Sequence, residues 1–269
     1  MKRRFPEILA SAIRDMADHG FDSIQRIDSW IGELRRAAVR DVPNALMLDR
    51  VFRQYLHALY ERHLERDRIG SLHQVARVDI DSIAPQLRAE LERRILTSAD
   101  LIRLNREQAI GETLKRFQGW ATSLPSGPAG VKLRKTAGEI AKPLKSRPFE
   151  ERRVLIDQGH KLIASVDSIV ATQNRAIAAV WRSHWRQAGY DYRSEHKALD
   201  GHVYAVRDSW AMDDGFMKKG HGYIDELTEQ PAQAPFCRCW FRWIYALRDL
   251  PETMLTEKGR SQLAKTRVR

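Results

Sequence analysis

The 269-residue sequence contains little cysteine and no long hydrophobic run. Its two cysteines, Cys237 and Cys239, are too few for a disulfide scaffold and indicate synthesis in a reducing compartment. No stretch approaches the roughly 18 consecutive apolar residues of a membrane span. The basic N-terminal residues precede no apolar segment of the kind found in a secretory signal. We therefore expect neither a membrane partner nor a secreted, disulfide-bonded fold.

Negative charge is also scarce relative to positive charge. The chain has 46 Lys and Arg against 35 Asp and Glu, which gives a formal net charge of +11. Lysine and arginine near phosphates release condensed counterions, so this balance is typical of proteins that bind polyanions. A solvated basic surface without a partner is the alternative. Hydrophobic residues make up 43% of the chain, enough for a packed core, and this excludes disorder throughout.

Helical periodicity dominates residues 1–122, which we predict as a helical N-terminal region. Pro6 can open a first helix and Gly20 can end it. Pro43 predicts the start of a longer helix that ends near Gly70, and Ser98 is a plausible N-cap for a further one. The apolar residues of these segments recur at three- and four-residue steps, as core-facing stripes do.

Residues 123–151 are predicted to form a basic linker. The segment Ser123–Gly130 holds two prolines and two glycines and predicts a turn. Residues 132–153 contain eight basic and three acidic residues, and Pro143 and Pro148 are expected to break this stretch into short pieces. The linker is either solvated or contacts the phosphate backbone of nucleic acid. The candidate contacts are Lys132, Arg134, Lys135, Lys142, Lys145 and Arg147, with Lys258, Arg260, Lys265, Arg267 and Arg269 in a basic tail over residues 248–269.

Residues 152–247 are predicted to form a compact C-terminal module. A long helix is expected from about residue 152 to 186, which would place Trp181 and Trp185 one turn apart in the core. A turn-rich segment follows, in which 203–206 and 240–245 could be strands. The predicted fold class is therefore mainly α, with a helical N-terminal region, a long central helix and a small α+β C-terminal module.

The glycine-rich segment of this module holds His196, His202, His221, Cys237 and Cys239, which are the ligand types that zinc prefers, and the candidate ligands are His196, His221, Cys237 and Cys239. A metal would stabilise a small segment that has little core of its own. Cys-x-Cys is not the common Cys-x2–4-Cys spacing, so buried free cysteines without a metal are the alternative.

His196 with Asp200 and Arg193 could instead form an acid–base cluster, for which the alternative is a histidine that only holds a loop. The sequence contains no phosphate-binding Gly-x-x-x-x-Gly-Lys-Ser/Thr loop, no Gly-x-Ser-x-Gly turn and no His-Glu-x-x-His motif.

The order of motifs over residues 150–247 resembles the phage Mu F-like head morphogenesis family of minor head (minor capsid) proteins. The family pattern is Arg-x-x-His, then Leu-x-Gly, a proline and a closing Cys-Arg-Cys. The matching positions are Arg193, His196, Leu199, Gly201, Pro235, Cys237, Arg238 and Cys239, with Asp200 inside the Leu-x-Gly element. Two features depart from the family: the residues before His196 are Arg-Ser-Glu, and residues 20–130 carry no family signature.

The resemblance implies a minor structural protein of a tailed-phage head, made in the host cytoplasm and located inside the capsid near the portal. Its partners would be the portal and major capsid proteins and packaged double-stranded DNA, contacted without sequence specificity during packaging or ejection. In this interpretation no residue is catalytic and no cofactor is required, zinc being the one candidate. Arg193 would orient a carboxylate or carbonyl, His196 would pin the loop, and Gly201 would permit a turn closed to other residues.

A different class of function is the main alternative. In a metal-dependent nuclease, His196 and Asp200 would bind metal or act as general base, and the basic surface would hold the DNA. A plain DNA-binding module is a third possibility, and it predicts binding that falls steeply with salt.

Overall fold

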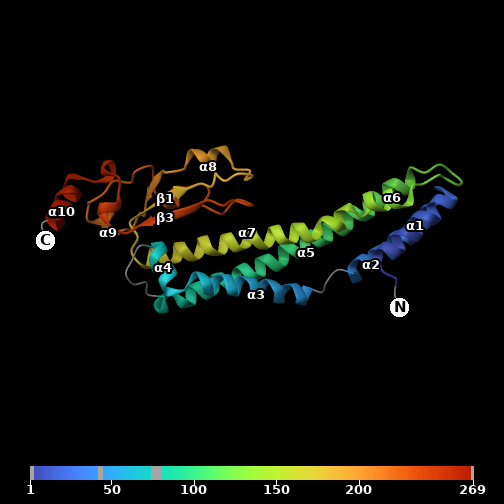
Figure 1. The fold of residues 1–269 in the computed structure, drawn as a ribbon, viewed down its shortest axis with the longest axis horizontal. Coiled ribbons are helices and arrows are strands. Elements are labelled where there is room, and N and C mark those ends of the chain that lie inside the picture. Colours follow the sequence, from blue (N-terminus) through green and yellow to red (C-terminus); the bar gives the residue numbers. More distant parts are fainter. Residues whose placement is uncertain (1–2, 42–44, 74–79, 268–269) are drawn as a thin grey trace. The chain divides into compact units, whose positions relative to one another are not determined.

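The computed structural model describes residues 3–41, 45–73 and 80–267 (Figure 1). The chain is mainly helical, with a small three-stranded antiparallel sheet in its C-terminal region, so the predicted fold class is confirmed. Among the described residues, no helix has both the length and the apolar character needed to cross a bilayer. The chain divides into two compact units, one of Met1–Phe52 and Leu96–Leu155 and the other of Arg53–Ile95 and Ile156–Arg269.

The first unit contains the N-terminal helices packed around one apolar core. Its elements are α1 (Phe5–His19), α2 (Ile24–Asp41) and α6 (Leu133–Ile140), with those parts of α3 (Ala45–His63), α5 (Ala84–Thr122) and α7 (Lys142–Gln173) that fall in its residue range. Leu9, Ile13, Leu34 and Phe117 are fully or almost fully buried in that core.

The predicted end of the first helix and the turn after α5 are both confirmed, and they contact each other. Gly20 caps α1 with φ 70°, and a Cβ at this position would lie 2.0 Å from the carbonyl oxygen of Pro125. Residues 123–132 are non-helical. Within this turn, the amide of Gly127 donates to His19 O at 3.1 Å and that of Ala129 donates to Ala17 O at 2.7 Å. The glycine is therefore required by the close approach of the turn.

The prediction that Pro143 and Pro148 break residues 132–153 is right at the first proline and wrong at the second, because the helix is interrupted at Ala141, just before Pro143, but not at Pro148. Pro143 occupies the first turn of α7, where its missing N–H costs no helical hydrogen bond. Pro148 lies inside α7, and the helix continues through it. Tertiary contacts hold the helix at this point, because Arg106 of α5 and Arg147 of α7 both contact Glu151, at 2.6 and 3.4 Å.

Two other helix boundaries differ from the prediction. Ser98 is not an N-cap: it is fully buried inside the continuous helix α5, because the apolar stripe through Ile95 and Ile102 continues across it. The single helix expected to end near Gly70 is instead two, α3 (Ala45–His63) and α4 (Arg66–His73), with Gly70 inside the second. Its expected start, Pro43, lies outside the described residues.

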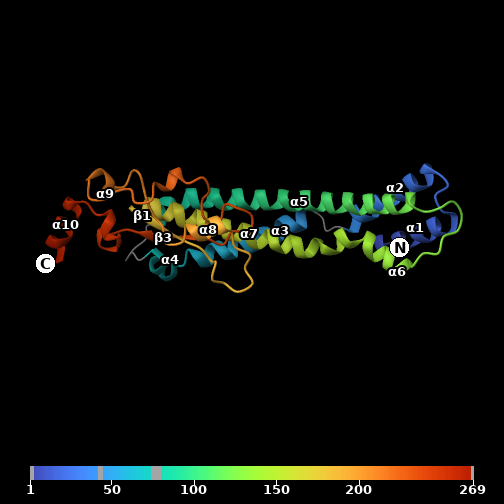
Figure 2. The same cartoon turned by 90° about the horizontal axis from the view of Figure 1, so that it is seen from above.

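The sheet of the second unit has the strand order β2-β1-β3. β1 (Ala178–Arg182) is the central strand, antiparallel to β2 (Val203–Ala205) and to β3 (Trp240–Ile244). The strands predicted at 203–206 and 240–245 are therefore confirmed. Two short α-helices, α8 (Ser194–Ala198) and α9 (Trp210–Asp213), complete the module, and α10 (Glu257–Arg267) lies in the tail that follows it, as Figures 1 and 2 show. The 3₁₀ turns are Asp81–Ile83, Ile224–Glu226, Leu247–Asp249 and Glu252–Met254.

The predicted helix over 152–186 is wrong in its second half. α7 ends at Gln173, and Arg175 follows with φ 62°, a left-handed turn. Residues 176–181 are all buried, because β1 is a central strand. Such a strand reads as a continuous apolar run that periodicity alone does not distinguish from a helix. Trp181 therefore lies in a strand, fully buried, and is not one helical turn from Trp185.

Candidate metal centre

The site begins at Arg193, which ties α8 to a distant loop. The Arg193 guanidinium donates from Nη2 to the carbonyl oxygen of Pro235 at 3.0 Å, across 42 residues of sequence. Arg193 thus orients a carbonyl, as expected from the sequence. His196, one helical turn along α8, is thereby held beside the segment that carries both cysteines.

The two cysteines present their sulfurs on one side of the chain. Cys237 and Cys239 immediately precede β3, and alternate residues of an extended chain face the same way. The loop before them is fixed by Asp157 of α7, whose Oδ1 accepts a 2.6 Å hydrogen bond from the Phe236 amide. Phe236 has φ 60°, so the backbone turns sharply just ahead of Cys237. Cys-x-Cys therefore places two sulfurs close together, where they could serve as a pair of ligands.

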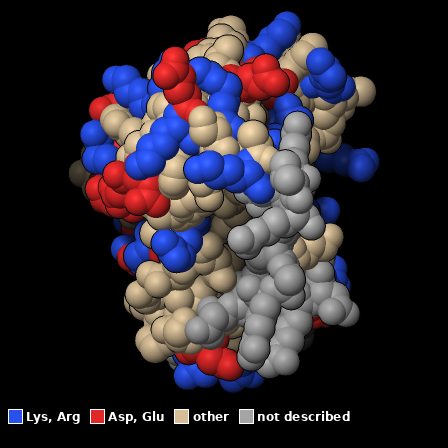
Figure 3. All heavy atoms as spheres, turned by 90° about the vertical axis from the view of Figure 1, so that its left-hand side faces the viewer, with Lys and Arg blue, Asp and Glu red and all other residues tan. Residues whose placement is uncertain are grey.

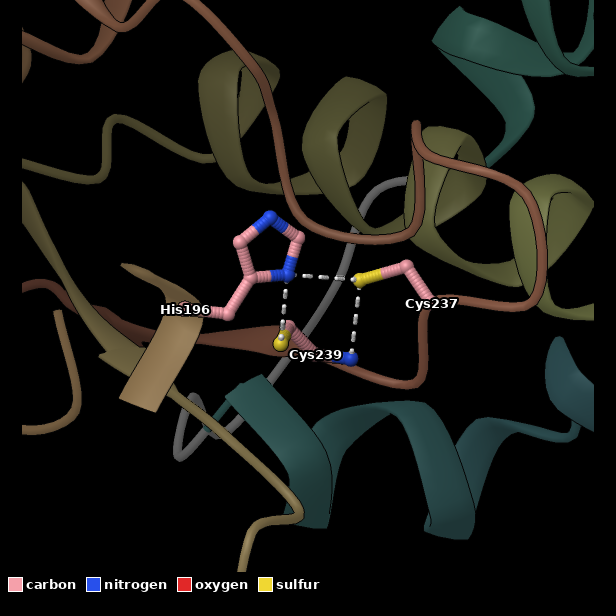
Figure 4. Close-up of side chains that lie close together, drawn as sticks. All are labelled: His196, Cys237 and Cys239. Atoms are coloured by element: carbon pink, nitrogen blue, oxygen red, sulfur yellow. Dashed lines mark hydrogen bonds between the residues drawn. The ribbon is translucent and has the colours of Figure 1, made fainter. Parts of the chain in front are cut away.

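His196, Cys237 and Cys239 form one buried group (Figure 4). The imidazole Nδ1 lies 3.4 Å from Cys237 Sγ and 3.6 Å from Cys239 Sγ. The three ligand atoms all lie within 4.8 Å of one another. The residues are 4%, 1% and 3% exposed, respectively. This is a group that could hold a metal ion.

The distance of the imidazole nitrogen from each sulfur fits a tetrahedral zinc ion. Zinc binds cysteine sulfur at about 2.3 Å and histidine nitrogen at about 2.0–2.1 Å, so a tetrahedral angle separates the nitrogen and sulfur by about 3.6 Å. The two observed N···S distances, 3.4 and 3.6 Å, match this edge. One imidazole and two thiolates are also the donor types that zinc selects.

Glu229 orients the histidine. Its Oε2 lies 2.8 Å from Nε2 of His196, so Nε2–H donates to the carboxylate and Nδ1 presents its lone pair to the sulfurs. A carboxylate behind a histidine ligand is the usual way in which proteins fix the tautomer of a metal-binding imidazole. Glu229 was not predicted, because nothing in the sequence relates it to a histidine 33 residues away.

The two thiols have opposite acidities. Cys237 accepts hydrogen bonds from the Cys239 thiol and from the amides of Cys239 and Ala232. These hydrogen bonds lower the pKa of Cys237 more than burial raises it, so the pKa falls well below its ordinary value. As the donor, Cys239 has its own pKa raised. The pair therefore holds one thiolate readily, and a bound cation would be needed to ionise the second.

Two buried donors lie beside the second sulfur. The indole N–H of Trp181 and the hydroxyl of Ser183 have no hydrogen-bond partner within the described part of the chain. Both lie near enough to Cys239 to lower its pKa, whereas the hydrogen bond that Cys239 donates to Cys237 raises it. A metal-bound thiolate at this position would give both groups the acceptor that they lack.

Two predicted site residues lie elsewhere in the module. His221 is not part of the metal-ligand group: its ring stacks on His202 with centroids 4.0 Å apart, and its Nδ1 lies 3.2 Å from the Val203 amide. Asp200 accepts hydrogen bonds from the Ser183 amide at 2.9 Å and from Trp185 Nε1 at 3.0 Å. The structure therefore does not assemble the predicted pairing of His196 with Asp200.

The remaining motif residues support the same loop. Gly201 has φ 88°, the left-handed turn expected of it, and its amide donates to Trp181 O at 2.9 Å. Leu199 packs against the apolar cluster that contains both cysteines. Arg238 points outward, with its guanidinium over the Tyr190 ring at 5.2 Å.

The candidate nucleic-acid contacts are distributed over several helices. Lys132, Arg134, Lys135, Lys142 and Lys145 are exposed, and Lys265 is exposed on α10. Arg147 is only 18% exposed and is paired with Glu151. The side chain of Arg267 and all of Arg269 lie outside the described residues. On the face shown in Figure 3, basic and acidic side chains are mixed, with no acid-free basic surface among the residues drawn in colour.

The chain matches no protein-family model, no curated protein sequence and no solved structure in the comparisons.

Proposed function

We propose that the protein is a minor structural component of a tailed-phage head, located inside the capsid near the portal, and that zinc braces its C-terminal module. One observation supports this most strongly. The separated elements of the motif on which the resemblance rests interlock, through the Arg193–Pro235 hydrogen bond and the His196–Cys237–Cys239 group. These residues brace one another, as the parts of a structural motif do.

The position of the group favours a structural role for the metal. All three donors are less than 5% exposed, and the imidazole nitrogen that is not a candidate ligand is taken by Glu229. Zinc bound there would join α8 to the start of β3, across 41 residues of chain. Binding to the folded state alone stabilises that state, and a small module with three short strands gains most from such a link.

Contact with packaged DNA would use the exposed cations rather than the metal group. Lys132, Lys135 and Lys142 are exposed on or beside α6 and the start of α7. Backbone contacts of this kind carry no sequence information, which suits a protein that must accept any packaged genome.

The head assignment is tested on particles of the phage or prophage that encodes the chain. Gradient-purified particles are analysed by quantitative mass spectrometry, and a few copies per particle are expected, retained after nuclease treatment. The variant Cys237→Ser is expected to be incorporated less than Arg238→Lys, a matched control in the same loop. Absence of the chain from full and empty particles would overturn the assignment.

The nuclease alternative has its own test. Purified protein is incubated with supercoiled plasmid and Mg²⁺, Mn²⁺ or Zn²⁺, and the plasmid is expected to remain intact. Cleavage that His196→Ala abolishes and Asp200→Asn weakens would support an enzyme instead.

A further inference from the structure

The first unit contains an apolar groove of about 520 Å³, lined only by residues of that unit. One face of α1 and one face of α6 form its walls, and the end of α2 and the start of α7 complete it. Its apolar lining includes Phe5, Leu9, Ala10, Leu133, Ala137 and Leu144. Residues 133–141 span about 12 Å at 1.5 Å rise per residue, so the groove is long enough for about two turns of a helix.

The rim of this groove is basic. Arg134 and Lys145 line it, are exposed, and have no ion-pair partner among the residues that the structure describes. Asp41, the acidic residue in the lining, is already engaged, because its Oδ2 accepts from the Phe5 amide at 2.6 Å. The charges of Arg134 and Lys145 therefore lie beside apolar surface and are available to a binding partner.

Arg147 adds a half-buried positive charge to the same lining. It shares Glu151 with Arg106, so two guanidinium groups contact one carboxylate. The buried Nε of Arg147 completes no hydrogen bond within the described chain. Burial lowers the pKa of Arg147; the charge of Glu151 opposes this effect, and the neighbouring Arg106 adds to it. A further carboxylate at this end of the groove would be stabilised.

We propose that this groove docks an acidic amphipathic helix of a partner protein. Apolar side chains at i, i+3 or i+4, and i+7 of that helix would fill the floor, and flanking Asp or Glu would pair with Arg134, Lys145 and Arg147. The proposal does not depend on the head assignment, since it rests on the first unit alone.

The alternatives fit this surface less well. Double-stranded DNA could pair its phosphates with the basic rim. The apolar floor would then either stay exposed to water or lie against phosphate groups, and both arrangements are unfavourable. A second copy of this chain, which also carries a formal net charge of +11, would be repelled by the rim. An acidic, apolar-faced helix complements both properties.

Gly138 offers a way to block the groove without disturbing the fold. It lines the groove on α6, and a Cβ added there would meet nothing within 4 Å. Gly138→Trp should therefore fill the groove, and replacing a helical glycine favours the helix. Gly119 on α5 also has open space around it and does not line the groove, so Gly119→Trp is the matched control.

The test uses the full chain and a fluorescein-labelled 18-residue peptide with leucines at helical spacing flanked by glutamates. Fluorescence anisotropy should show binding that Gly138→Trp weakens at least tenfold and Gly119→Trp leaves unchanged. The double variant Arg134→Glu, Lys145→Glu should weaken binding of this peptide and improve binding of a counterpart with lysine in place of glutamate. Circular dichroism and thermal melts verify that each variant is folded.

Three outcomes would overturn the proposal. The acidic peptide could bind no tighter than its lysine counterpart, or Gly138→Trp could leave its Kd unchanged. In the third, Gly138→Trp would weaken binding of a 20-base-pair DNA duplex as much as that of the peptide, which would assign the surface to nucleic acid. Particle incorporation is measured separately, so failure of the groove and failure of the head assignment are distinguishable.

Discussion

Glu229 accepts a 2.8 Å hydrogen bond from Nε2 of His196 and thereby turns the other ring nitrogen toward Cys237 and Cys239. The carboxylate is 41% exposed whereas the histidine side chain is 5% exposed, so the ring is held from the solvent side. The ring nitrogen that could bind a metal is thus positioned by a residue on the opposite edge of the imidazole.

Purified protein is expected to contain one zinc ion per chain, measured by elemental analysis. Cys237→Ser and Cys239→Ser should lose it, because each removes one of three donors. Glu229→Ala should weaken zinc binding about 10- to 100-fold, the usual effect of removing a carboxylate behind a histidine ligand. Glu229→Gln should restore part of the affinity.

The exposed Glu252 supplies the control for this experiment, since Glu252→Ala should leave zinc affinity unchanged. Protein that carries no stoichiometric zinc after expression in zinc-supplemented medium would show that the group only packs. A Glu229→Ala variant with wild-type affinity would disprove the orienting role.

Zinc removal should also lower the stability of the C-terminal module. Competition with a strong chelator is expected to lower the Tm of the wild-type chain, because the ion binds only the folded ligand set. The same chelator should have no effect on the Tm of Cys237→Ser. Equal shifts for both proteins would mean that the stabilising ion lies elsewhere.

The acid stability of the second unit should depend on Asp167. Its Oδ1 lies 2.6 Å from Nε2 of His63 and 3.3 Å from Nε2 of His73. Burial raises the pKa of Asp167, but the hydrogen bonds and charges of the two histidines outweigh burial and leave the pKa below its ordinary value. The ionised Asp167 carboxylate therefore contributes its full stabilisation above the pKa of an unfolded aspartate, about 3.9. This stabilisation is lost as the pH falls through the lower pKa of Asp167 in the folded state.

Urea unfolding at pH 7 and between pH 4 and 2 checks this prediction. Asp167→Asn should cost about 1–3 kcal/mol at pH 7 and should reduce the loss of stability on acidification. The exposed Asp191 provides the control, and Asp191→Asn should behave as wild type. If the Asp167→Asn variant loses as much stability as the wild type between pH 4 and 2, Asp167 is not the group responsible.

Gly201→Ala should destabilise the module through its backbone alone. Gly201 has φ 88°, and an added Cβ would meet nothing within 4 Å, so no steric clash contributes. The expected cost is about 1–2 kcal/mol, that of a left-handed conformation in an L-residue. Gly111→Ala, inside α5 with equally open space, should instead stabilise by roughly 0.5–1 kcal/mol. The two variants are compared by chemical denaturation, and opposite signs are required.

DNA binding should be electrostatic and weakly dependent on sequence. Removing one lysine that pairs with a phosphate reduces the slope of log K against log salt by about 0.9, so Lys132→Gln, Lys135→Gln and Lys142→Gln together should reduce it by about 2.7. Filter binding of two duplexes of unrelated sequence measures the slope. No binding at low salt would refute the proposed role of these lysines.

Local signals in the sequence were sufficient for many elements and for the three metal-ligand candidates. Pro6 and Gly20 bracket α1, and the aromatic and β-branched runs predicted β2 and β3. His196, Cys237 and Cys239 could be chosen because zinc prefers those side chains whatever the fold.

The tertiary structure decided what depends on neighbours distant in sequence. β1 was indistinguishable from a helix until strands on both sides buried it, and α7 continues through Pro148 because Glu151 binds arginines of two helices. Long-range packing likewise brings Glu229 to His196, whereas Asp200, which lies nearer in sequence, binds the Ser183 amide instead. Residue type and spacing determine which side chains can bind a metal, whereas only the folded chain determines which of them meet.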